Sequence, residues 1–264
     1  MNEAILGGLL AAGTDPSDVV ATVRRAERAA ELAERHGVMA IAGVEEPDNN
    51  KLATKGASIV ILGVKPVGIA DLAREISPVL SQNTIVISVA AAVSIAQLEA
   101  ALPEGQPVIR TMPNTPAKLG RGVVSVSPGT NCTDAQLQQA KDILAAAGSV
   151  VEIPEEQVDA LSAISGSGPA YAFYLAEAMA AAGVELGLDP DLSLKISRET
   201  VAGAGFMLAE PGADPTALRI AVTSPNGTTE RAIAAFNEGG IPSIIADGAR
   251  AAAARAAEIT RQLG

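Results

Sequence analysis

The sequence predicts a two-domain α/β protein, with a doubly wound sheet domain over residues 1–153 and an all-α domain over residues 154–264. In the first part, short β-branched runs alternate with helical patterns, which is typical of a mostly parallel sheet with helices on its faces. After Pro154 the segments all show helical periodicity. A chain of 264 residues is long enough for two ordinary domains.

The expected elements follow in chain order. The predicted strands are Val19–Val23, Ser58–Val64, Thr84–Val89, Val108–Met112, Val123–Val126 and Ser149–Ile153. The predicted helices between them are Arg25–His36, Val67–Ile76, Ser94–Ala101 and Asp134–Ala147. The helices expected after Pro154 are Glu155–Ile164, Pro169–Leu186, Asp191–Glu210, Pro215–Val222, Thr228–Asn237 and Ile241–Gln262.

Composition narrows the function classes. The chain is 48% hydrophobic but 2% aromatic, so its core consists mainly of Ala, Val, Leu and Ile. A net charge of −11 argues against nucleic acid as a partner, because phosphate backbones need basic patches. No apolar run approaches ~18 residues and no signal peptide is evident, so we expect no membrane span and a cytoplasmic protein. The single cysteine, Cys132, excludes an intrachain disulfide framework.

Few side chains are suited to metal binding or acid–base chemistry. His36 is the only histidine, and it stands before Gly37, where a cation stabilises a helix C-terminus. No His/Cys cluster has metal-ligand spacing, so we expect no metal. Hydride transfer fits such a chain, because a cofactor carries the difficult step.

Donor groups are concentrated in the segment Leu218–Asn237, where one helical run ends and the next begins. It contains Thr223-Ser224-Pro225-Asn226-Gly227-Thr228-Thr229. Helix N-termini present unpaired N–H groups that bind carboxylates or phosphates. The alternative is a simple N-cap at Thr228 or Thr229. The number of donors exceeds what one cap needs and favours a binding site.

Four ordered motifs over essentially the whole chain resemble those of the Δ1-pyrroline-5-carboxylate reductase family. They are Gly63-Val64-Lys65-Pro66, the run from Arg110 to Pro116 (RTMPNTP), the run from Ile164 to Tyr171 (ISGSGPAY) and VTSPNGTT, in which Asn226 replaces a usual Gly. The resemblance implies a Rossmann-like first domain and a helical domain that interlocks with a partner subunit. It implies at least a homodimer, and a higher homo-oligomer such as a decamer.

The resemblance also indicates a missing element at the start. A nucleotide-binding sheet normally opens with a strand and G-x-G-x-x-G, whereas this chain opens Met1-Asn2-Glu3, like the family's first helix. Either the sequence begins at an internal Met or the protein lacks this strand, which would expose apolar sheet edges. Gly7 and Gly8 fall mid-helix and are assigned to close packing.

The resemblance implies a nicotinamide cofactor. Thr22 and Arg24 follow the second strand of such domains, where hydroxyl and Arg groups bind the 2′-phosphate of NADPH; NADH remains the alternative, as does an ordinary surface arginine. Small residues after another strand let the dinucleotide approach the backbone. The full set of expected cofactor residues is Thr22, Arg24, Asn50, Gly63, Val64, Lys65, Pro66, Val89, Ala90, Ala91, Met112 and Asn114. For Asn50 the neighbouring Asn49 leaves the register open, and for Asn114 a structural Asx-turn is the alternative.

The implied substrate is pyrroline-5-carboxylate, a cyclic imine with a carboxylate. Ser224 and the backbone N–H groups of Thr228 and Thr229 are the expected carboxylate ligands, and the Thr229 hydroxyl the expected partner of the ring nitrogen. Gly227, Ser165 and Gly166 complete the predicted substrate set. Threonine is a poor acid, so orientation and proximity are expected to supply most of the acceleration.

Two other functions remain open from the sequence. One is a different two-domain reductase of the hydroxyacid dehydrogenase type, which uses a catalytic Lys or His; here Lys195 is the only Lys after residue 150. The other is a truncated or degenerate paralogue that acts as a non-enzymatic oligomeric protein. The intact VTSPNGTT loop argues against degeneration.

Overall fold

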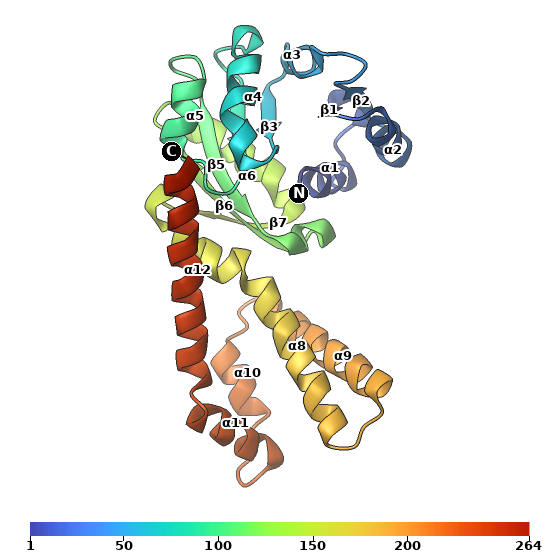
Figure 1. The fold of residues 1–264 in the computed structure, drawn as a ribbon, viewed down its shortest axis with the longest axis vertical. Coiled ribbons are helices and arrows are strands. Elements are labelled where there is room, and N and C mark those ends of the chain that lie inside the picture. Colours follow the sequence, from blue (N-terminus) through green and yellow to red (C-terminus); the bar gives the residue numbers. More distant parts are fainter. Residues whose placement is uncertain (264) are drawn as a thin grey trace. The chain divides into compact units, whose positions relative to one another are not determined.

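The computed structural model describes residues 1–263 and divides the chain into two compact units. Unit 1 contains Met1–Gly166 together with the residues from Ala253 onward, and unit 2 contains Ser167–Ala252. Figure 1 shows the strands of unit 1 and the helices of unit 2. Helix α12, Ile241–Leu263, begins in unit 2 and ends in unit 1.

Unit 1 contains two sheets. In the smaller one, β1 (Val20–Val23) and β2 (Met39–Ala42) pair in parallel. The larger has the order β3-β4-β5-β6-β7, formed by Ile59–Leu62, Ile85–Ser88, Val108–Pro113, Gly122–Pro128 and Gly148–Glu152. Its neighbours pair in parallel except β5 and β6, which are antiparallel. Within residues 1–263, β1 and β3 each keep one unpaired edge, so the predicted single sheet is divided in two.

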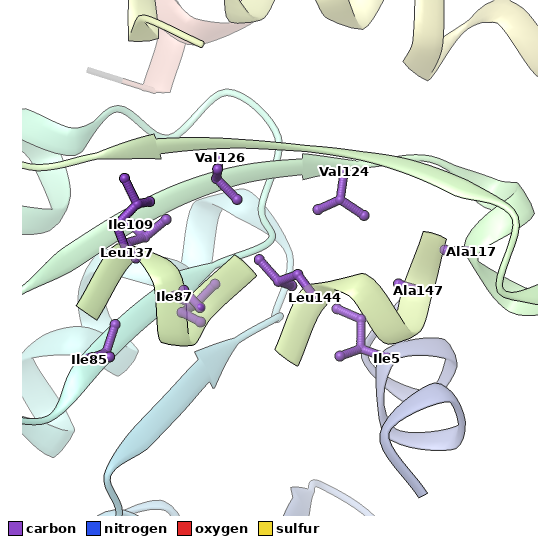
Figure 2. Close-up of a cluster of buried hydrophobic side chains, with 11 residues drawn as sticks. Ile5, Ile85, Ile87, Ile109, Ala117, Val124, Val126, Leu137, Leu144 and Ala147 are labelled. Carbon is purple, nitrogen blue, oxygen red and sulfur yellow. The ribbon is translucent and has the colours of Figure 1, made fainter. Parts of the chain in front are cut away.

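Helices cover both faces of the larger sheet. On one face, Ile85, Ile87 and Ile109 pack with Leu144 of α6 and Ile5 of α1, and Figure 2 shows this cluster. On the other face, α4 and α5 contribute a second cluster of buried aliphatic side chains. The bounds are α1 Asn2–Ala11, α4 Ile69–Ile76, α5 Ile95–Ala101 and α6 Asp134–Leu144. The α/β architecture expected for the first domain is confirmed.

Helix α1 also packs on the smaller sheet. Its Leu6 forms a cluster with Leu32 of α2 (Ala26–His36) and Val38. Glu3 of α1 forms ion pairs with Arg28, Arg35 and His36 of α2. As predicted, α2 ends at His36, and Gly37 adopts the left-handed conformation with φ 69°.

Two elements of unit 1 were not predicted. Strand β2 was missed because Met39-Ala40-Ile41-Ala42 contains one β-branched residue and resembles no strand by composition. Helix α3, Asn49–Thr54, is too short for helical periodicity to be recognised.

The predicted continuous helix Glu155–Ile164 is also wrong. The segment is a 3₁₀ turn at Glu155–Gln157, a short α7 at Val158–Leu161 and a π-helix at Ser162–Gly166. One physical reason is visible, because the Ser165 carbonyl accepts a hydrogen bond from a side chain outside the helix.

Unit 2 consists of helices, as predicted. They are α8 Gly168–Glu185, α9 Pro190–Leu208, α10 Pro215–Ala221, α11 Thr228–Glu238 and the first part of α12. Helices α8 and α9 pack tightly, because Ser193 donates to the Ala180 carbonyl at 2.7 Å and a Cβ on Gly183 would overlap the Ser193 hydroxyl.

Unit 2 leaves its apolar side chains uncovered. Within it, only Ser193 and Ser197 are buried among the described residues. Leu186 is 86% exposed, and Phe173 and Tyr174 are 69% and 71% exposed. Large uncovered apolar surfaces of this kind mark protein–protein contacts.

Candidate active site

Loops that follow β1 and β3 line a hollow of about 480 Å³ in unit 1. Its lining residues are Arg24, Arg25, Val64, Lys65, Val67 and Gly68. Arg24, Val64 and Lys65 belong to the predicted cofactor set, so the fold brings together residues that are forty positions apart in the sequence. Arg25, Val67 and Gly68 were not predicted; Arg25 could have been found from its place beside Arg24.

The charge around this hollow is strongly positive for an acidic protein. Arg24, Arg25 and Lys65 are exposed, and none of them forms an ion pair with any residue that the structure describes. Unpaired guanidinium groups beside a cavity attract phosphate oxygens, which they bind in a forked geometry. The hollow therefore suits a ligand that carries phosphate.

The end of β3 lies directly against the start of α1. A Cβ on Gly63 would overlap the Asn2 side chain, so a larger residue here would displace Asn2. Helix α1 has no side-chain cap at its N-terminus. Its first N–H groups therefore have no side-chain acceptor, and Asn2 brings the start of the helix close to Gly63, two residues before Lys65.

The loop after β4 contains the predicted residues Val89, Ala90 and Ala91. The next residue, Ala92, has φ 63° and is 9% exposed. A left-handed backbone is strained for alanine, so the surrounding packing holds this loop in a defined shape. The Thr111 hydroxyl donates to the Ser88 carbonyl at 2.9 Å and ties the start of the loop to β5.

Asn114, just after β5, is almost completely engaged inside the protein. Its side-chain amide donates to the Ser165 carbonyl at 2.9 Å and its oxygen accepts the Val123 N–H at 2.9 Å. The residue is 7% exposed. The structure thus joins Asn114 to Ser165, a predicted substrate residue, while its expected contact with the nicotinamide stays a prediction. Met112 lies near the same segment, because its methyl carbon is 3.3 Å from the position of a Cβ on Gly166.

The two candidate asparagines near the adenosine ribose have different surroundings. Asn49 is 4% exposed and donates to the carbonyls of Val23 and Ile41, so it ties β1 to β2. Asn50 is half-buried and donates to the Glu75 carboxylate at 3.1 Å. The surroundings of Asn50 are the more compatible with a ligand, although neither Asn50 nor Thr22 lines the hollow.

The sequence did not predict a partly buried ion pair between β5 and the segment after Pro154. Arg110 on β5 is 5% exposed and donates to the Glu155 carboxylate at 2.8 Å. The same carboxylate oxygen accepts the Ile95 N–H at 2.7 Å, at the start of α5. An arginine within an apolar strand was the available signal, because buried charges are normally paired.

In unit 2, the donor-rich loop meets α11 as the sequence predicted. The N-cap of α11 is Gly227, which offers no side-chain cap, so neither Thr228 nor Thr229 is the capping residue. Among the described residues, no partner is recorded for the hydroxyls of Ser224 and Thr229 or the N–H groups of Thr228 and Thr229. These groups remain available to a carboxylate.

Asn226 adopts φ 59°, which confirms that the loop needs a residue that tolerates the left-handed region. Its N–H donates to the Glu230 carboxylate at 2.8 Å. A Cβ on Gly227 would lie 2.9 Å from the Ser224 carbonyl oxygen, so this position requires glycine.

Residues 1–263 contain neither a candidate metal centre nor a candidate membrane-spanning helix. No group of three or more His, Cys, Asp or Glu side chains is gathered so that it could hold a metal ion. None of the described helices has the length and hydropathy to cross a membrane.

Comparison with known proteins identifies the family. The family model for pyrroline-5-carboxylate reductase dimerisation matches residues 155–259, and the model for coenzyme F420-dependent NADP oxidoreductase matches residues 1–92. The pyrroline-5-carboxylate reductase of Corynebacterium melassecola is 39% identical over 98% of this chain and 95% of its own length. The chain belongs to the pyrroline-5-carboxylate reductase family. The reductase of Pseudomonas aeruginosa is similar to it at 38% identity over 100% of this chain and 95% of its own.

Solved reductases of the family share this fold. A Coxiella burnetii pyrroline-5-carboxylate reductase aligns with a TM-score of 0.91 and 32% identity over 98% of this chain and 94% of its own. A Plasmodium falciparum pyrroline carboxylate reductase, solved with NADP bound, aligns with a TM-score of 0.80 and 22% identity over 98% of this chain and 94% of its own. The predicted fold class, a Rossmann-like domain followed by a helical domain, is confirmed.

Proposed function

We propose that this protein reduces Δ1-pyrroline-5-carboxylate to L-proline with NAD(P)H, the final step of proline biosynthesis. The observation that carries this is the full-length similarity to pyrroline-5-carboxylate reductases. The uncapped donor loop before α11 supports it independently, because its free groups suit an anionic substrate.

The residues around the 480 Å³ hollow fit a dinucleotide. Arg24, Arg25 and Lys65 would hold phosphate groups. The close approach of Asn2 to Gly63 places the start of α1 beside the end of β3, next to these residues. The loop Val89–Ala91 and the end of β5 at Met112 would lie along the rest of the cofactor. When bound, the nicotinamide supplies the hydride for the imine carbon.

We infer that NADPH is preferred over NADH. Arg24 follows β1 and has no protein partner within residues 1–263, so its guanidinium is available for a 2′-phosphate. No acidic side chain lines the hollow, whereas NAD-specific enzymes place one near the ribose.

At the start of α11, the chain's own groups bind and orient the substrate. The Ser224 hydroxyl and the backbone N–H groups of Thr228 and Thr229 donate to the substrate carboxylate, aided by the positive end of the helix. The Thr229 hydroxyl bonds the ring nitrogen and orients it for protonation from solvent. No metal takes part in this proposal.

The assembly is a homo-oligomer. Its exposed apolar helices and the dimerisation family model agree with this. We propose at least a dimer and a higher assembly such as a decamer, with residues 1–153 as the dinucleotide-binding domain and 154–264 as the substrate-binding and oligomerisation domain. The compact units divide slightly later, at Gly166. We also propose a cytoplasmic location, which the single free Cys132 supports.

The test is an NADPH and NADH oxidation assay with pyrroline-5-carboxylate. It uses this chain and a version with an added strand and G-x-G-x-x-G, because β1 and β3 each have an unpaired edge. Proline formation by either version supports the proposal, whereas its absence from both contradicts it. Arg24→Ala should raise the KM for NADPH about tenfold and that for NADH less than twofold, since a charged hydrogen bond is lost. Arg74→Ala, an exposed arginine on α4, is the control.

A further inference from the structure

The amide of Asn114 joins two segments of unit 1 that are far apart in the sequence. Asn114 follows β5, and the carbonyl to which it donates belongs to Ser165, 51 residues later. Its side-chain oxygen is held by the Val123 N–H at the start of β6. One buried side chain therefore fixes Ser165 against the β5–β6 pair.

Ser165 lies in an irregular stretch of helix. It belongs to the π-helix Ser162–Gly166, which is the last turn of unit 1 before Ser167 begins unit 2. π-Helical turns are rare and are found mostly at functional positions. The Ser165 hydroxyl is buried and has no hydrogen-bond partner. A buried unpaired hydroxyl persists only where the surrounding structure holds it in place, or where a ligand or water completes it.

We infer that Asn114 is a positioning residue that acts through Ser165. The hydrogen bond from its amide holds the π-helical turn, so that Ser165 and Gly166 stay beside Met112 at the end of β5. The effect on catalysis rests on the proposed function, in which Ser165 and Gly166 belong to the substrate site and Met112 to the cofactor site. Asn114 itself touches neither ligand in this inference, which is an alternative to its predicted contact with the nicotinamide.

Asn114→Asp separates the two hydrogen bonds. The carboxylate keeps an oxygen for the Val123 N–H but presents an acceptor to the Ser165 carbonyl, so this bond is lost and replaced by repulsion. Asn114→Ser is the second variant, because its neutral side chain is too short to reach Ser165 and introduces no buried charge.

Gln106→Glu is the matched control. Gln106 is 3% exposed, and its side-chain amide donates to the carbonyls of Ser81 and Thr84, before the amino end of β4. The substitution therefore removes a buried amide donor from the same unit, at the opposite end of the parallel strands from Asn114.

The measurements are backbone hydrogen exchange, NADPH binding and steady-state kinetics on the full chain. We expect exchange in residues 162–166 to become at least tenfold faster in both Asn114 variants and to stay unchanged in Gln106→Glu. The KM for pyrroline-5-carboxylate should rise about tenfold in both, while the Kd for NADPH changes less than twofold.

Unchanged exchange in both Asn114 variants, or an equal effect of Gln106→Glu, overturns the inference. A rise in the NADPH Kd with unchanged exchange would instead assign Asn114 to the cofactor. Hydrogen exchange needs no substrate, so it tests the Asn114–Ser165 hydrogen bond even if the wild-type chain reduces no pyrroline-5-carboxylate. That failure would contradict the proposed function and leave this inference standing.

Discussion

The Glu230 carboxylate accepts the backbone N–H of Asn226 at 2.8 Å, across the junction between the donor loop and α11. This bond holds Asn226 at φ 59°, a conformation that few residues adopt. Glu230 also places a negative charge in the first turn of α11, where this charge opposes the binding of a carboxylate at the positive end of the helix. The same residue thus shapes the proposed substrate loop and opposes the charge of its ligand.

Glu230→Gln should separate these effects. The amide oxygen can still accept the Asn226 N–H, while the negative charge is removed. We expect the KM for pyrroline-5-carboxylate to fall about threefold, because removing the repulsion between Glu230 and the substrate carboxylate contributes less than about 1 kcal/mol. Glu238→Gln, at the other end of α11, should leave the KM unchanged. An unchanged or higher KM in Glu230→Gln would show that the charge does not act on the substrate.

Substitutions of Asn226 test the left-handed backbone. Asn226→Gly should keep the loop geometry and change the KM for pyrroline-5-carboxylate less than twofold. Asn226→Val should raise it about tenfold, because a β-branched residue in the left-handed region costs roughly 1–2 kcal/mol and favours another loop conformation. Equal kinetics for the two variants would contradict a role for this conformation.

Thr229→Ala should lower turnover about tenfold and leave the Kd for NADPH nearly unchanged, because one hydrogen bond to the reacting nitrogen is lost. Thr228→Ala is the comparison, since we expect its contribution to come from the backbone N–H, which alanine keeps. Its kcat should fall less than twofold. If Thr229→Ala turned over at the wild-type rate, Thr229 would have no part in the mechanism.

Ala92→Gly should stabilise the protein. The left-handed conformation of Ala92 costs roughly 1–2 kcal/mol, and glycine removes this cost. Part of the gain in stability is lost, because glycine raises the conformational entropy of the unfolded chain. The net expectation is an increase of about 0.5–1 kcal/mol in the free energy of unfolding, measured by urea denaturation. Ala91→Gly, next to it without a positive φ, should destabilise instead. Destabilisation by both would rule out strain at Ala92.

Glu3 should make stability depend on pH at the acid end. Its hydrogen bonds from His36 and then Arg28, with the charges of Arg28 and Arg35, lower its pKa from 4.5 to about 2. A lowered folded-state pKa stabilises the protein fully above pH 4.5, and the stabilisation is lost as the pH falls toward 2. Glu3→Gln should therefore cost about 1 kcal/mol at pH 7, and the difference from wild type should shrink below pH 4.5. A difference that stayed constant down to pH 3 would assign the loss to packing.

Local patterns predicted much of the candidate site. The donor loop, the position of Asn226 and the placement of Lys65 after an apolar strand could be read from short segments, because turns, caps and strand ends depend on neighbouring residues. Arg25 and the ion pair between Arg110 and Glu155 were missed. Arg25 could have been found beside Arg24, whereas the ion pair depends on which segments meet, because Arg110 lies 45 residues from Glu155.

The sequence by itself determined the order of the strands and helices except β2 and α3, the need for a residue that tolerates a left-handed backbone at Asn226, and the family. These follow from periodicity, turn chemistry and motifs, which act over a few residues. Only the tertiary structure decided that the strands form two sheets, that Asn114 binds Ser165 and that Ala92 is strained. Strand pairing and buried side-chain partners are set by contacts between distant segments, and the local periodicity of the sequence does not indicate which segments meet.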